Sequence, residues 1–154
     1  MQIRSATPAD VPQMSAFLMR PTELGKRTRP SGETFVLDYY INGPDKIRCT
    51  LAEEDGVVLG FQSIARAPEG NEFGVTPGWG IIGTHVNPDA ARRGVGRALF
   101  PISLKAAQDA GLTDIDASIG ADNPEGLAYY EAMGFRTYRT PAGKICKRYQ
   151  LYSV

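Results

Sequence analysis

A stretch of glycines and arginines past the middle of the chain is the part whose residue types most clearly suit a chemical role. It runs Val86-Asn87-Pro88-Asp89-Ala90-Ala91-Arg92-Arg93-Gly94-Val95-Gly96-Arg97-Ala98-Leu99. The order predicts the end of a strand, a tight turn and the start of a helix. The N–H groups at a helix N-terminus carry partial positive charge and suit a pyrophosphate. Gly94 and Gly96 are expected to let such a ligand approach the backbone closely.

Two common phosphate-binding motifs are absent from the sequence. A nucleotide-binding P-loop needs G-x-x-x-x-G-K followed by Ser or Thr, and no segment fits. A dinucleotide-binding turn follows the first strand and ends G-x-G-x-x on a small residue, whereas Leu99 occupies that position here. A nucleotide-binding fold remains an alternative, and it predicts tight binding of ADP or NAD.

A second block lies downstream, and it reads Asn123-Pro124-Glu125-Gly126-Leu127-Ala128-Tyr129-Tyr130-Glu131-Ala132-Met133-Gly134-Phe135. Together the two blocks resemble the GNAT superfamily of acetyl-CoA-dependent N-acyltransferases. That family has a strand ending V-x-P before R/Q-x-x-G-x-G/A, and later an Asn followed by a short helix ending Y-E-x-x-G-F. The specific resemblance covers Gly78 to Tyr138, and a looser one begins at Ile3. Ala91 departs from the family's usual Arg or Gln, and we expect Arg92 and Arg93 to supply the charge.

The resemblance implies both a fold and an activity. The fold is one α/β (α+β) domain over residues 1–154, with a mixed, mostly antiparallel sheet of six or seven strands. Helices cover both faces, and the sheet has a central V-shaped splay. The activity is transfer of an acetyl group from acetyl-CoA to a primary amine, which we expect to belong to a small molecule, by direct attack in a ternary complex. The alternative is a catalytically weak sensor or partner module that binds CoA or acetyl-CoA.

The resemblance also implies where acetyl-CoA binds. Its pantetheine arm would pair with the edge of the strand Trp79–Val86, as an added strand does. A backbone N–H near Thr84 or His85 would face the thioester oxygen and stabilise the oxyanion. The expected cofactor-binding residues are Thr84, Val86, Arg92, Arg93, Gly94, Val95, Gly96, Arg97, Ala98, Asn123 and Tyr130.

Tyr130 matches the general acid of the family. A phenol with a pKa of about 10 can protonate a departing thiolate, whose thiol has a pKa of about 8.5. Tyr129 is expected to be an ordinary aromatic on the helix face, and capping of the helix explains Asn123 as well as CoA binding does.

The general base is less evident, because Gly80 and Ile82 stand where many family members carry Glu or His. His85 is the single histidine, but strand alternation places it on the opposite face from Thr84. We keep it as a candidate base. The other candidates, acting through water, are Glu72, Asp116 and Ser118.

Acceptor recognition is expected from three segments, which are 20–32, 33–41 and 67–78. Aromatic side chains there and on the following strand are candidates for an apolar pocket, and two arginines could meet a carboxylate. The aromatic candidates are Phe35, Tyr39, Tyr40, Phe73 and Trp79, and the arginines are Arg27 and Arg29.

Composition narrows the partners. The 154 residues include 17 Lys and Arg and 17 Asp and Glu, so the formal net charge is zero, which argues against nucleic acid and anionic membranes as partners. Cys49 and Cys146 lie far apart, which is typical of reduced thiols in a cytoplasmic protein. One histidine and no Cys/His cluster argue against a metal site. We also see no apolar signal run or membrane-spanning stretch.

The expected elements follow from periodicity and from capping residues. A helix from Pro8 carries Thr7 as its cap, and irregular chain follows from Arg20 to Gly32. Pro101 should bend the long helix after the glycine turn. We expect Lys147–Tyr152 to be an edge strand that could join a homodimer. The other strands are Met1–Ala6, Ile47–Glu53, Val57–Arg66, Trp79–Val86, Asp114–Ile119 and Phe135–Tyr138, and the other helices are Glu33–Ile41, about 95–110 and 123–134.

Overall fold

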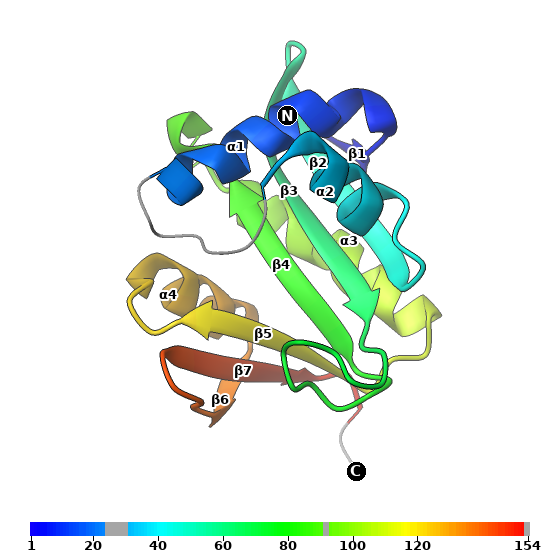
Figure 1. The fold of residues 1–154 in the computed structure, drawn as a ribbon, viewed down its shortest axis with the longest axis vertical. Coiled ribbons are helices and arrows are strands. Elements are labelled where there is room, and N and C mark those ends of the chain that lie inside the picture. The colour runs from blue at the N-terminus through cyan, green and yellow to red at the C-terminus, as the bar shows by residue number, and fades with distance from the viewer. Residues whose placement is uncertain (24–30, 91–92, 153–154) are drawn as a thin grey trace.

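The structure, a computed structural model, describes residues 1–23, 31–90 and 93–152. One sheet forms its centre and short helices flank it (Figure 1). The strands are β1 (Gln2–Ser5), β2 (Lys46–Glu54), β3 (Val57–Arg66), β4 (Gly80–Val86), β5 (Asp114–Gly120), β6 (Arg136–Arg139) and β7 (Lys144–Gln150). The helices are η1 (Pro8–Asp10), α1 (Val11–Glu23), α2 (Glu33–Val36), η2 (Leu37–Ile41), η3 (Pro88–Ala90), α3 (Val95–Asp109) and α4 (Pro124–Met133).

The sheet order is β1-β2-β3-β4-β5-β7-β6, and its neighbours are antiparallel except for β4 and β5. The parallel pair is short. Its register joins Gly80 to Ile115 and Ile81 to Asp116, and no pairing follows in the described strands. Figure 1 shows β4 and β5 diverging from that point. The predicted mixed, mostly antiparallel sheet with a central splay is therefore confirmed.

The helices cover both faces of the sheet, as predicted. On one face, α1 and α2 bury a cluster around Met14, Tyr40 and Phe61. On the other face, α3 packs on β2 and β3, and α4 packs on β5 and β7. A second cluster fills the space between these two helices and the sheet, and it contains Phe100 and Phe135.

Gly60 on β3 allows α3 to begin directly against the sheet. A Cβ there would lie 2.9 Å from both the Val95 side chain and the His85 carbonyl oxygen. Real Cβ atoms do not approach so closely, so only glycine fits without a shift of the backbone. This close approach fixes the N-terminus of α3 beside the end of β4.

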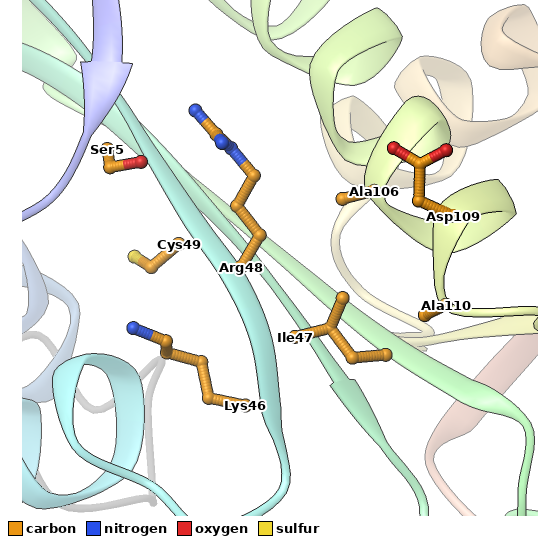
Figure 2. A pocket seen from close by; sticks show the side chains of 8 residues that line it. All are labelled: Ser5, Lys46, Ile47, Arg48, Cys49, Ala106, Asp109 and Ala110. Carbon is orange, nitrogen blue, oxygen red and sulfur yellow. The ribbon is translucent and has the colours of Figure 1, made fainter.

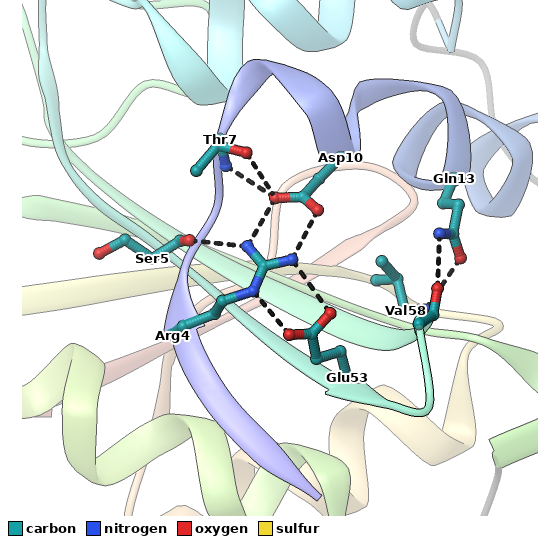
Figure 3. A network of polar contacts seen from close by, with 8 residues as sticks. Arg4, Ser5, Thr7, Asp10, Gln13, Glu53 and Val58 are labelled. Carbon is teal, nitrogen blue, oxygen red and sulfur yellow. Dashed lines mark hydrogen bonds and ion pairs between the residues drawn. The ribbon is translucent and has the colours of Figure 1, made fainter.

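Polar contacts hold the N-terminal segment to the sheet (Figure 3). The Arg4 guanidinium donates to both carboxylate oxygens of Asp10, at 2.8 and 2.7 Å, and to Glu53 at 2.9 Å. Asp10 also accepts from the Thr7 N–H at 2.8 Å, which caps η1. Gln13 on α1 binds the β2–β3 hairpin through Gly56 and Val58.

Several predicted boundaries were wrong. Helix α1 continues to Glu23, so residues 20–23 are helical although Pro21 suggested a loop. Strand β7 begins three residues earlier than expected and lies between β5 and β6, so it is not an edge of the sheet. The edge on that side is β6, so the dimer contact that we expected from an exposed β7 edge has no basis. Helix α3 contains Pro101, as predicted. Arg27 and Arg29 lie outside the described residues.

Within the described residues, no helix is both long and apolar enough to cross a membrane.

Candidate active site

The glycine turn ends at Gly94, which is the N-cap of α3. Its φ is 76°, a left-handed conformation that favours glycine, and nothing lies within 4 Å of the position of a Cβ. Among the described residues, no side chain caps this helix. The first N–H groups of α3 are therefore available to an anion, as an α-helix N-terminus requires for that role.

Gly96, two residues further on, has a different neighbour. A Cβ there would lie 2.6 Å from the Tyr129 ring, and the Tyr129 hydroxyl donates to the Gly96 carbonyl at 2.7 Å. The open approach that we expected at Gly96 is therefore wrong on this side, because Tyr129 fills the space. Tyr129 is also more than an ordinary aromatic on the helix face, since it joins α4 to the first turn of α3.

The described arginines of the turn differ in their partners. Arg93 forms an ion pair with Glu54 in the β2–β3 hairpin, which lowers the pKa of that carboxyl group. Arg97 is exposed on the first turn of α3, close enough to Tyr129 for its charge to favour the ionised phenol. Ala91 and Arg92 lie outside the described residues. Of the two described arginines of the turn, Arg93 is paired with a carboxylate, and Arg97 lies on the exposed side of α3 near Tyr129.

Tyr130 lies on the inner side of α4 and is 7% exposed. Its hydroxyl is 2.8 Å from the hydroxyl of Thr84 on β4. Burial raises the pKa of Tyr130 well above its usual range, while the hydrogen bond with Thr84 lowers it. Tyr40 and Asp116 also lie near enough to raise that pKa. Side chains from both faces of the sheet therefore approach Tyr130 where β4 and β5 part.

The backbone of β4 also presents groups to the splay. The Asn87 N–H donates to Leu59 on the β3 side, at 2.8 Å. Because the N–H direction alternates along a strand, the Thr84 and Val86 amides point the other way, toward β5. Pairing with β5 ends at Ile81. Of the two amides that we considered for the thioester oxygen, the one that faces the splay belongs to Thr84, and the one of His85 faces β3.

The His85 side chain lies on the α1–α2 face, opposite Thr84, as strand alternation predicted. Its Nε2 is 3.3 Å from the Tyr40 hydroxyl, and its ring lies 4.9 Å from the Phe61 ring. Phe35 stacks on Tyr39 at 5.3 Å, and Tyr39 contacts Tyr40 at 4.9 Å. The structure therefore brings His85 together with three of the five aromatic residues proposed for the acceptor, because Tyr40 contacts His85, Phe35 and Tyr39.

Trp79, another of the five aromatic candidates, lies elsewhere on the sheet. Its ring contacts Tyr138 at 5.7 Å, and the Arg148 guanidinium lies 4.9 Å from the ring centre. Tyr138 in turn donates to the buried carboxylate of Asp116, which also accepts from Ser118 at 2.7 Å. Trp79 is thus part of a β5–β6–β7 cluster and is not brought together with Phe35 and Tyr39.

The remaining candidates are readily placed. Asn123 caps α4, because its side chain accepts from the Gly126 N–H at 3.0 Å. That cap holds the start of the helix that carries Tyr130. Glu72 is exposed in the 67–78 loop. In the described part of the chain, no three His, Cys, Asp or Glu side chains gather as metal ligands would.

Two surface hollows lie away from Tyr130. One, of about 410 Å³, lies between β2 and the end of α3 (Figure 2), and the other, of about 560 Å³, lies along β6 and β7. Burial raises the pKa of Cys49 in the first hollow to about 12, so its thiol stays protonated. Neither hollow contains Thr84 or Tyr130, and nothing in them suits acyl transfer. The first is lined by Ser5, Lys46, Ile47, Arg48, Cys49, Ala106, Asp109 and Ala110.

Comparison with known proteins identifies the family. A model of the acetyltransferase (GNAT) family matches residues 12–135, and the chain belongs to that family. This confirms the resemblance carried by the two sequence blocks. Among curated relatives, the mycothiol acetyltransferase of Saccharomonospora viridis is 34% identical over 92 residues, which cover 58% of this chain and 30% of the relative. The chain therefore spans about a third of the length of that relative.

Solved structures share the fold. A GCN5-related N-acetyltransferase from Kribbella flavida has a TM-score of 0.79 at 22% identity, with 97% of each chain covered. A putative acetyltransferase from Salmonella typhimurium, solved with its cofactor acetyl-CoA, has a TM-score of 0.73 at 20% identity and covers 100% of this chain and 95% of its own. These likenesses confirm the predicted α/β fold.

Proposed function

We propose that the chain transfers the acetyl group of acetyl-CoA to the primary amine of a small molecule, by direct attack in a ternary complex. One observation carries the proposal. The Tyr130 hydroxyl and the outward N–H of Thr84 lie where β4 leaves β5, at the end of the strand that leads to the N-terminus of α3. A donor for the leaving group, a donor for the oxyanion and an anion-binding helix end are thus aligned along one strand.

Each part of acetyl-CoA has a matching feature. The pyrophosphate fits the open N-terminus at Gly94, and the pantetheine arm fits the unpaired side of β4. The Thr84 N–H stabilises the oxyanion, a contribution of about 2.7–4 kcal/mol for one such donor. Tyr130 donates its proton to the departing sulfur.

The acceptor amine approaches from the α1–α2 face in this proposal. Phe35, Tyr39 and Tyr40 supply aromatic surface there, and His85 is held between Tyr40 and Phe61. We assign His85 as the proton acceptor. Asp116, acting through Ser118, is the second candidate, since Ser118 already donates to it at 2.7 Å. This pair lies on the other side of the splay, on β5.

The test is an acetyltransferase assay with the purified chain. Acetyl-CoA is offered with a panel of small amines, which includes the acceptor of the mycothiol acetyltransferases because a relative carries that name. Release of free thiol is read with a chromogenic reagent, and Tyr130→Phe is the control. Thiol release well above the Tyr130→Phe background supports the proposal.

Titration calorimetry with CoA, ADP and NAD separates the alternatives. Tight CoA binding without thiol release for any amine would identify a sensor or partner module. Binding of ADP or NAD as tight as that of CoA would identify a nucleotide-binding protein.

A further inference from the structure

A chain of hydrogen bonds connects the first turn of α3 to Tyr130 through Gln62, which is a fully buried residue of β3. The Gln62 Nε2 lies 2.9 Å from the Tyr129 hydroxyl and 2.9 Å from the Thr84 hydroxyl. Thr84 in turn lies 2.8 Å from Tyr130. Neither hydroxyl of the last pair is assigned as donor by distance alone. The donor of each hydrogen bond can nevertheless be assigned by starting from the Gly96 carbonyl.

The count begins at the Gly96 carbonyl, because a carbonyl can only accept. Tyr129 has a single hydroxyl proton, and it donates that proton to Gly96 at 2.7 Å. Tyr129 can therefore only accept from Gln62, so the atom of Gln62 that faces it must be the amide nitrogen. The second proton of that nitrogen is then directed at Thr84.

The direction of the last bond follows. Thr84 accepts from Gln62, and its own proton can reach two oxygens among the described residues, that of Tyr130 at 2.8 Å and that of Tyr129. Since the Tyr129 hydroxyl already accepts from Gln62 and donates to Gly96, Tyr130 is the acceptor that remains for the Thr84 proton. Thr84 therefore donates to Tyr130. With Thr84 as the donor, the Tyr130 proton stays available to a ligand.

We propose that Gln62 and Thr84 are positioning residues, which set the hydrogen-bond direction so that Tyr130 presents its proton to the sulfur of the leaving CoA. The inference rests on the proposed function, in which Tyr130 is the general acid. It adds the residues that orient that acid. The Gln62 Oε1 is buried without a partner among the described residues. The hydrogen bonds of this side chain are therefore those that its Nε2 donates to Tyr129 and Thr84.

Proton transfer from Tyr130 accompanies the departure of CoA. The C–S bond of the tetrahedral intermediate breaks, the electron pair leaves with sulfur, and the Tyr130 proton binds sulfur to give the thiol. The hydrogen bond that Thr84 donates stabilises the tyrosinate that remains. The proton that the attacking nitrogen loses passes to His85 and from there to solvent, and a solvent proton restores Tyr130. No oxidant or additional reactant is needed.

The leaving group provides the test. Thr84→Val keeps the shape and the backbone N–H of the residue but removes the hydroxyl, and Gln62→Met removes the donor. Each variant is assayed with acetyl-CoA and with the acetyl thioester of a nitro-substituted aromatic thiol, whose thiolate leaves without an acid. We expect kcat for acetyl-CoA to fall by about tenfold or more. The KM for acetyl-CoA and the relative rate with the aromatic thioester should change less than about twofold.

Two controls bracket the result. Thr84→Ser should restore most of the rate with acetyl-CoA. Thr50→Val makes the same substitution at a buried threonine, which pairs with Gln62 in the sheet but has its hydroxyl bound to Arg48. It should leave both rates unchanged. Since Thr84→Val is nearly isosteric, it carries the test if Gln62→Met does not fold.

Three outcomes decide the matter. Equal losses with both donors in Thr84→Val would overturn the inference, because they indicate structural damage. A leaving-group-dependent loss in Tyr130→Phe with no loss in Thr84→Val would also overturn it, while leaving the proposed function intact. Full activity of Tyr130→Phe with acetyl-CoA would overturn the acid assignment on which both depend.

Discussion

At the scale of single residues, the two glycines of the turn serve different physical needs. Gly94 adopts a left-handed φ of 76°, where a side chain is strained. Gly96 has an ordinary helical place in α3, but the Tyr129 ring occupies the position of its Cβ. The first glycine is needed for conformation and the second for space. Substitutions at the two positions should therefore fail in different ways.

For Gly96→Ala, we expect the free energy of unfolding to fall by about 1–3 kcal/mol, because the new methyl group overpacks against Tyr129. CoA binding, measured by calorimetry, should weaken with it. The cost should shrink in a Tyr129→Leu background, since the ring is gone. Additive costs in the double variant would contradict the contact.

The two candidate bases can be separated by single substitutions. His85→Gln removes the imidazole beside Tyr40, and Ser118→Ala breaks the bond to Asp116. If His85 accepts the proton, kcat should fall by about 10²-fold or more in His85→Gln. Ser118→Ala should stay within a few-fold of the parent chain. Steady-state kinetics of the two variants with acetyl-CoA checks the result.

At the scale of elements, α4 depends on its first residues. Asn123→Ala removes the bond to the Gly126 N–H, and we expect a loss of about 1 kcal/mol in the free energy of unfolding. Asn123→Asp should retain most of the stability, since its carboxylate also accepts from that N–H. Thermal unfolding measures both variants. Equal losses in the two would show that the cap is not what the asparagine supplies.

Most elements could be predicted from local signals. Asn123 and Pro124 mark the start of α4, Gly134 marks its end, and the Asp55–Gly56 turn marks the β2–β3 hairpin. The missed boundaries lie where a local signal misleads. Pro21 suggested a loop, yet α1 continues past it to Glu23. Strands β6 and β7 begin at Arg136 and Lys144, and they pair with each other in the sheet. Their first residues are therefore set by this pairing, which no local pattern reveals.

The site was predictable only in part, for a related reason. Gly94 and Tyr130 belong to motifs, so their residue types and spacing were informative. Gln62 gave no signal, because a lone glutamine in a strand becomes meaningful only when Thr84 and Tyr129 lie beside it. Trp79 and Phe35 both looked suited to an acceptor pocket, yet Trp79 packs on Tyr138 and Arg148 while Phe35 packs on Tyr39 and Tyr40. Such relations arise from tertiary packing and are absent from the linear pattern.

At the scale of the whole molecule, ion pairs make stability depend on pH. Hydrogen bonds from Arg4 lower the pKa of Asp10 and of Glu53, and one from Lys147 lowers that of Glu131. A carboxyl group with a lowered folded pKa stabilises the fold above its ordinary pKa of about 4 and loses that effect as pH falls through the folded value. Acid titration of unfolding should therefore show stability declining below about pH 4.5.

Arg4→Leu tests this dependence. We expect a loss of about 2 kcal/mol at neutral pH from the bonds to Asp10, which is buried. The difference from the parent chain should narrow toward pH 3, where the carboxyl groups are protonated in both. Lys105→Leu is the matched control, because its pair with Asp109 is exposed and should matter little at any pH. A constant difference across the pH range would exclude the linkage.

The parting of β4 and β5 has a consequence for folding cooperativity. Only two residue pairs join β4 to β5 in the described strands, and the two parts of the sheet are otherwise joined by side chains, chiefly those of the cluster between α3, α4 and the sheet. Residues 114–150 therefore form a segment that can open separately from the preceding chain. Amides of β5 and β7 should exchange with deuterium sooner than those of β2 and β3. A pantetheine arm bound between β4 and β5 would bridge the two parts of the sheet. CoA should therefore slow amide exchange in β7, although the ligand does not touch that strand. It should also make the two parts unfold in a single step.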